Sequence, residues 1–102
     1  MSVYNNGTHW VWRLTGTDFK ATYVDKTIEL NTWYSVEMHW DGVNGTAELF
    51  VNGSREIRIE NINNTGIAPY TFYLGVWTDY GPGNPHSIYF DDVVVSNVYV
   101  GP

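Results

Sequence analysis

The feature that most limits what this chain can fold into is a repeated alternation of apolar and polar residues in short segments. No stretch shows the helical pattern of apolar residues at positions i, i+3, i+4 and i+7. Instead, β-branched and aromatic residues recur with a period of two, which places successive side chains on opposite faces of an extended strand. The pattern predicts an all-β chain of about seven strands, at 8–14, 19–24, 33–40, 46–51, 56–59, 70–78 and 87–100.

The clearest local signal is a hairpin that joins segments 33–40 and 46–51. The residues between them contain Asp-Gly and Asn-Gly pairs, which tolerate the positive φ that tight turns require. Alternation predicts one apolar face across both strands, and we expect this face to join the core. Its members are Tyr34, Val36, Met38, Trp40, Ala47, Leu49 and Val51.

Length, composition and charge restrict the class of protein. A chain of 102 residues with 43% hydrophobic and 17% aromatic residues suits one domain over 1–102, and it contains no cysteine for a disulfide. Its net charge of −6 disfavours binding to a phosphate backbone, and the basic pair Arg55 and Arg58 alternates with Glu56 and Glu60. No apolar run reaches the ~18–20 residues that cross a bilayer. We therefore predict neither nucleic acid nor membrane as a partner.

Three short stretches resemble a known superfamily. They are WYSVEMHW at 33–40, ELFVNG at 48–53 and YFDDVVVS at 89–96. In this order they resemble the concanavalin A-like lectin/glucanase superfamily, especially its laminin G-like members. The resemblance implies an antiparallel, jelly-roll-like β-sandwich. Because domains of that superfamily are usually longer, a minimal version, a fragment or a homodimer that shares sheets through strand edges all remain open.

The superfamily contains lectins, adhesion modules, glycoside hydrolases and polysaccharide lyases, so the resemblance alone does not select a function. Sugar recognition combines a flat aromatic ring with polar groups that bind hydroxyls, and the loop at 77–86 supplies both. We predict a non-catalytic, lectin-like module, extracellular or at the cell surface, that binds a polysaccharide or glycan. Its predicted ligand-binding residues are Trp77, Asp79, Tyr80, Asn84 and His86.

Other aromatic residues and the glycosylation motifs add less. Trp10 and Trp12 share a strand face and could extend the aromatic platform, although such a pair is more typical of a core. The chain has Asn-x-Ser/Thr motifs that weakly support export, but most of them coincide with Asn-Gly turns. These motifs begin at Asn6, Asn44, Asn52 and Asn63.

Asp91 and Asp92 are adjacent carboxylates within an otherwise apolar segment. In a strand one of them would point towards each face, so one would need a partner in the interior. A structural Ca²⁺ bound through Asp91 or Asp92, and hydrogen bonds to backbone amides or to an arginine, explain the pair equally well. The three histidines show no spacing typical of a transition-metal site.

Two further functions stay open. Glu37 and His39 share a strand face and could form an acid/base unit, although surface alternation explains them at least as well. A polysaccharide lyase would need a base and a charge-neutralising residue, and Tyr80, His39 and Arg13 fit only by type. The alternatives to a binding module are therefore a fragment of a lyase or glycoside hydrolase, and a structural or adhesion subunit that assembles through strand edges.

Overall fold

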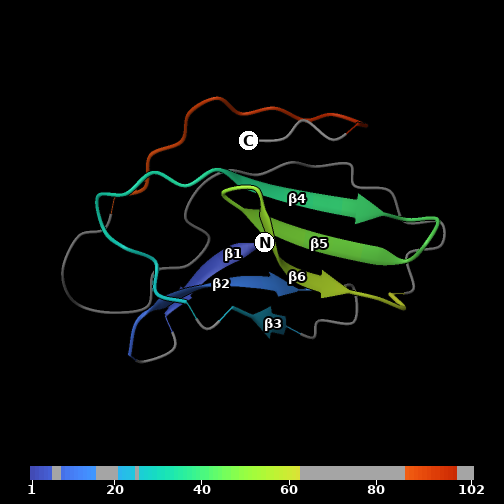
Figure 1. Cartoon of the computed structure of the whole chain (residues 1–102), viewed down its shortest axis with the longest axis horizontal. Coiled ribbons are helices and arrows are strands. Elements are labelled where there is room, and N and C mark those ends of the chain that lie inside the picture. The colour runs from blue at the N-terminus through green and yellow to red at the C-terminus, as the bar shows by residue number, and fades with distance from the viewer. Residues whose placement is uncertain (6–7, 16–20, 25, 63–86, 99–102) are drawn as a thin grey trace. The chain divides into compact units, whose positions relative to one another are not determined.

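The computed structural model describes residues 1–5, 8–15, 21–24, 26–62 and 87–98 (Figure 1). The chain divides into two compact units, of which the first is Met1–Ala68 with Gly101–Pro102 and the second is Pro69–Val100. All regular secondary structure in the described residues is β-strand, and the strands form two antiparallel three-stranded sheets in the first unit. The all-β prediction is confirmed for these residues. A search of the same residues finds no helix long and apolar enough to cross a membrane.

The first sheet has the order β1-β2-β3, with β2 in the centre. Its strands are β1 (Ser2–Asn5), β2 (Trp10–Thr15) and β3 (Ala21–Tyr23). β2 and β3 fall within or close to predicted segments, whereas β1 was not predicted. β1 is too short to show a clear alternation by itself, and its pairing with β2, with Val3 opposite Trp12, defines it as a strand.

The second sheet has the order β4-β5-β6. Its strands are β4 (Val36–Asp41), β5 (Thr46–Val51) and β6 (Ser54–Ile59). The hairpin of β4 and β5 has the predicted register, because Val36 lies opposite Val51 and Trp40 lies opposite Ala47. Alternation along both strands therefore assembles one apolar face.

The turn between β4 and β5 is fixed by Asp41 and Gly45. Oδ1 of Asp41 accepts hydrogen bonds from the backbone amides of Val43 and Asn44, both at 2.9 Å. These hydrogen bonds lower the pKa of Asp41, and the one from the Asn44 amide contributes most. Gly45 has a φ of +64°, and a Cβ atom there would lie 2.5 Å from the carbonyl oxygen of Ile62. The turn thus requires glycine both for its backbone conformation and for the close approach of Ile62.

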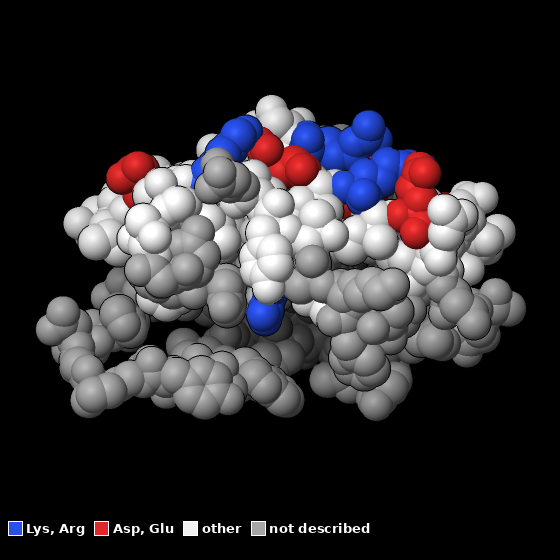
Figure 2. All heavy atoms as spheres, turned by 90° about the horizontal axis from the view of Figure 1, so that it is seen from below, with Lys and Arg blue, Asp and Glu red and all other residues white. Residues whose placement is uncertain are grey.

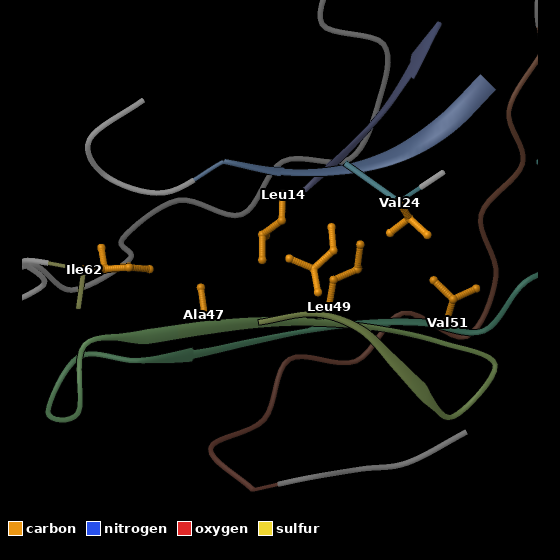
Figure 3. Packing of buried hydrophobic residues seen from close by; sticks show 7 residues of the cluster. Leu14, Val24, Ala47, Leu49, Val51 and Ile62 are labelled. Carbon is orange, nitrogen blue, oxygen red and sulfur yellow. The ribbon is translucent and has the colours of Figure 1, made fainter. Parts of the chain in front are cut away.

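The hydrophobic core lies between the two sheets (Figure 3). Leu14 and Val24 point from the first sheet towards Leu49 and Val51 of the second. Leu49 is fully buried, and burying such a side chain stabilises a fold by roughly 1.5–3 kcal/mol. The complete buried cluster is Leu14, Val24, Ala47, Leu49, Val51, Ile57 and Ile62.

The predicted apolar face of the hairpin is confirmed with one exception. Tyr34, Val36 and Trp40 pack against the buried cluster, whereas Met38 is 45% exposed. Met38 lies on β4, at the edge of the sheet, while the cluster is centred on β5. Because Val36 and Trp40 of the same strand pack against the cluster, Met38 departs from the alternation pattern as a single position of β4.

The prediction of a buried strand at 87–100 is wrong for its described part. Residues 87–98 form no strand, and Val93, Val94 and Val95 are all exposed, Val95 to 75%. Asp92 has a φ of +49°, in the left-handed region, which interrupts an extended backbone. The predicted strand at 70–78 lies outside the described residues. These contain six strands, which are five of the predicted ones and the unpredicted β1.

Candidate functional site on the outer face of the second sheet

The face of β4, β5 and β6 that points away from the hydrophobic cluster carries mainly polar side chains. We call this set the polar face, and it consists of Glu37, His39, Glu48, Phe50, Arg55 and Arg58. The strand register aligns these residues in two rows. One row runs from Glu37 through Phe50 to Arg55, and the other from His39 through Glu48 to Arg58.

A β-bulge brings both arginines to the polar face. Ile57 pairs with Leu49, but the next pair along β5 is Phe50 with Arg55, so Glu56 is an extra residue in β6. Without this insertion, residues three apart such as Arg55 and Arg58 would point to opposite faces. Glu56 instead forms an ion pair with Nζ of Lys26 at 2.7 Å.

His39 is held between two carboxylates. Its Nε2 lies 3.1 Å from Oε2 of Glu37, and its Nδ1 lies 3.6 Å from Oε2 of Glu48. The imidazole also packs on the ring of Phe50, with a centroid separation of 4.6 Å and an interplanar angle of 37°. Contacts on both nitrogens and on the ring together fix the orientation of His39.

Glu48 is the centre of the ion-pair network. Its Oε1 accepts hydrogen bonds from Nη1 of Arg55, at 2.9 Å, and from Nη1 of Arg58. The side chain of Glu48 is only 15% exposed, and burial by itself would raise its pKa. The hydrogen bonds and charges of the two arginines outweigh burial, so the pKa is lowered from its ordinary value of 4.5.

The network continues from Arg58 to Glu60, with Nε of Arg58 2.7 Å from Oε1 of Glu60. Its hydrogen bonds to Glu60 and Glu48 raise the pKa of Arg58. Figure 2 shows acidic and basic side chains intermingled along one border of the described surface. Opposite charges thus offset one another at this border, although the chain as a whole is acidic.

The polar face can both donate and accept hydrogen bonds. A guanidinium has five N–H donors, and the contact with Glu48 engages one donor of Arg55. The carboxylates of Glu37 and Glu48 supply acceptors, and the rings of Phe50 and His39 supply apolar surface. Such a combination suits a ligand with many hydroxyl groups, while the contact between Glu37 and His39 has the geometry of an acid/base pair.

The sequence-predicted ligand residues Trp77, Asp79, Tyr80, Asn84 and His86 lie outside the described residues. The structure therefore leaves the predicted 77–86 site as a prediction.

Asp91 and Asp92 are described, and both are exposed. Oδ1 of Asp91 accepts a hydrogen bond from the backbone amide of Asp92 at 2.9 Å. The expectation that one carboxylate points into an interior is wrong, because neither residue lies in a strand. In the described parts of the chain, no three His, Asp or Glu side chains are grouped as ligands for a metal ion.

The residues named for other roles are not assembled into one site. Trp12 packs against the hydrophobic cluster and makes an edge contact with Tyr34, with ring centroids 5.7 Å apart, which agrees with its interpretation as a core residue. Arg13 belongs to β2, where its Nε donates to Oγ of Ser2 at 2.9 Å. His39 lies on the second sheet, so the structure does not bring His39 and Arg13 together.

Sequence reasoning identified Glu37 and His39 but missed the other members of the polar face. The hairpin register alone places Glu48 opposite His39, so this contact was available from the alternation pattern. The contacts of Arg55 and Arg58 could not be predicted in this way, because the common orientation of the two side chains depends on the bulge at Glu56.

Comparisons with protein-family models, with curated proteins and with solved structures found no match to this chain. The functional interpretation therefore rests on the chemistry of its own residues.

Proposed function

We propose that this chain is a non-catalytic, lectin-like module with a jelly-roll-like sandwich fold that binds a polysaccharide or glycan outside the cell. The observation that carries the proposal is the polar face, where cross-strand contacts fix donors, acceptors and aromatic rings in place. A site whose groups are already oriented loses less conformational entropy when a ligand binds.

The polar face suits the two kinds of surface on a sugar. Hydroxyl groups donate and accept hydrogen bonds, which Glu37 and Arg55 can satisfy, while the C–H face of a pyranose packs on a ring such as Phe50. In this proposal the 77–86 loop supplies the larger aromatic platform through Trp77, with Asp79, Tyr80, Asn84 and His86 as hydrogen-bonding groups.

Glycan-array screening followed by isothermal titration with the full chain tests the proposal. We expect Trp77→Ala and Arg55→Ala each to weaken binding by about tenfold, the change that corresponds to about 1.4 kcal/mol. Val43→Ala is the control, because Val43 is 96% exposed in the hairpin turn and belongs to neither set of residues. Failure of every neutral and acidic polysaccharide to bind would contradict the function.

The proposal includes a structural Ca²⁺ at Asp91 or Asp92 and a homodimer formed through strand edges. Both are separable from sugar binding. Unfolding with and without a chelator tests for the ion, since a bound ion stabilises the folded state. Light scattering over a concentration series tests for the dimer.

Catalysis on a polysaccharide is the second candidate, and the contact of 3.1 Å between Glu37 and His39 favours it. A lyase would release unsaturated uronate products, which absorb in the ultraviolet. If absorbance rises with the full chain and does not rise with His39→Ala, the chain is an enzyme and the non-catalytic proposal is wrong.

A further inference from the structure

Trp33 is an exposed tryptophan within a loop that several hydrogen bonds hold in place. It is 68% exposed and lies in the connection between β3 and β4, close in sequence to Leu30, which is also exposed. Trp10, Trp12 and Trp40, the other tryptophans that the structure describes, are half-buried. An exposed ring of this size is a candidate contact surface because tryptophan carries much apolar area together with a polar N–H group.

The loop is closed on the N-terminal side of Trp33. The backbone amide of Glu29 donates a hydrogen bond to the hydroxyl of Tyr34 at 2.9 Å, and Oγ1 of Thr32 donates to the carbonyl of Leu30 at 3.1 Å. Asn31 adopts a φ of +54°, which turns the chain between these contacts. Residues 29–34 therefore form a compact turn whose ends are joined by Tyr34.

The C-terminal side is anchored to the second sheet. The backbone amide of Ser35 donates to Oδ1 of Asn52 at 2.9 Å, and the amide of Asn52 donates to the carbonyl of Ser35 at 2.7 Å. Tyr34, between this pair and Trp33, packs against the hydrophobic cluster. Because consecutive side chains in an extended backbone point in opposite directions, an inward Tyr34 directs Trp33 outward.

We propose that Trp33 is a second sugar-binding platform, on which the C–H face of a neutral pyranose stacks. Glu29, Asn31 and Thr32 precede it in the same loop, are exposed, and carry the acceptor and donor groups that pyranose hydroxyls need. The inference rests on the proposed function, and it deepens that function by naming a residue and a ligand class.

Two observations select a neutral sugar over other occupants. The chain carries a net charge of −6 and Glu29 belongs to the same loop, so a uronate or sulfated polymer, or an anionic membrane, would be repelled. Trp33 and Leu30 are separated by the polar residues Asn31 and Thr32, whereas the central part of a protein interface is more continuously apolar. One exposed aromatic side chain in a loop with exposed polar residues matches a sugar.

The experiment is isothermal titration of the full chain with a panel of neutral and acidic polysaccharides. We expect Trp33→Ala to weaken binding of the neutral ligand by about tenfold and Trp33→Tyr, which keeps a ring, by no more than about threefold. Val43→Ala controls for the loss of an exposed apolar residue elsewhere. Unfolding midpoints of both Trp33 variants should equal that of the parent chain, because the side chain contributes little to the core.

The outcomes separate this inference from the proposed function. If no polysaccharide binds the parent chain, the function itself fails. If a polysaccharide binds and Trp77→Ala weakens it while Trp33→Ala does not, the function stands and the Trp33 platform is wrong. If Trp33→Ala leaves sugar binding unchanged but abolishes a dimer detected by light scattering, the occupant is a second copy of the chain and the inference is likewise overturned.

Discussion

Residues 36–59 and 87–98 have different structures, although strands were predicted in both. Both segments are rich in β-branched and aromatic residues. The first forms the three-stranded sheet of β4, β5 and β6 around the buried Leu49. The second forms no strand and exposes seven large apolar side chains, namely Ile88, Tyr89, Phe90, Val93, Val94, Val95 and Val98.

The difference shows that a high content of β-branched and aromatic residues is insufficient to make a strand. β4 and β5 are partners across a short turn, so each satisfies the backbone groups of the other at a small cost in loop entropy. Within the residues that the structure describes, segment 87–98 pairs with no strand. Its described hydrogen bonds are local: the Asp92 amide donates to Oδ1 of Asp91, and the Val98 amide donates to Oγ of Ser96.

The largest effect should come from truncating a buried side chain in the sheet of β4, β5 and β6. Leu49→Ala should reduce the free energy of unfolding by about 2–5 kcal/mol, because it leaves a cavity between the two sheets. Val51→Ala and Val95→Ala are a matched pair. The free energy of unfolding should fall clearly for the buried Val51 and change within about 0.5 kcal/mol for the exposed Val95. Urea unfolding measures all three. Equal losses for the matched pair would show that segment 87–98 is packed as tightly as the sheet.

The turn that allows β4 and β5 to pair gives the next effect. Gly45→Ala should cost roughly 1–3 kcal/mol for a residue other than glycine in the left-handed region, and the contact with the Ile62 carbonyl should add to this cost. Val43→Ala, in the same turn, is the control and should be close to neutral because its side chain is exposed. Thermal unfolding of the two variants tests the prediction. An unchanged midpoint for Gly45→Ala would mean that the hairpin does not depend on this backbone geometry.

The smallest effect concerns charge. The folded-state pKa of Glu48 is lowered from 4.5, so the stabilisation it provides is complete above that value and is lost as pH falls through the lowered pKa. In the Glu48→Gln variant the free energy of unfolding should therefore fall less than in the parent chain as pH decreases from about 7 to about 3. Urea unfolding midpoints measure the difference. Asp91→Asn is the control, because Asp91 lies outside the ion-pair network. An equal change in both variants would contradict the cross-strand origin of the effect.

Much of the first unit followed from local sequence. The hairpin, its register and its apolar face were predictable because the turn residues and the alternation lie within a few residues of each other. The pairing of Ser35 with Asn52 was not predicted, yet it joins two stretches that carry the resemblance, WYSVEMHW and ELFVNG. Short-range signals of this kind need no knowledge of distant residues.

The candidate site was only partly predictable. Glu37 and His39 were named from their spacing, but the role of Arg55 and Arg58 depended on an extra residue in β6. The exposure of Met38 and Trp33 was not predicted either. These features arise from contacts between segments that no local pattern contains.

By itself, the sequence determined that this chain builds strands, where its central hairpin turns and which face of that hairpin is apolar. It could do so because side-chain alternation and turn chemistry act over a few residues. Only the tertiary structure decided which apolar segments are buried, which charges meet on the polar face and which tryptophan remains exposed. Burial depends on partners far away in the chain, which the packing of one sheet against the other brings together, and the ion pairs of the polar face depend on the bulge that turns both arginines to the same side of β6.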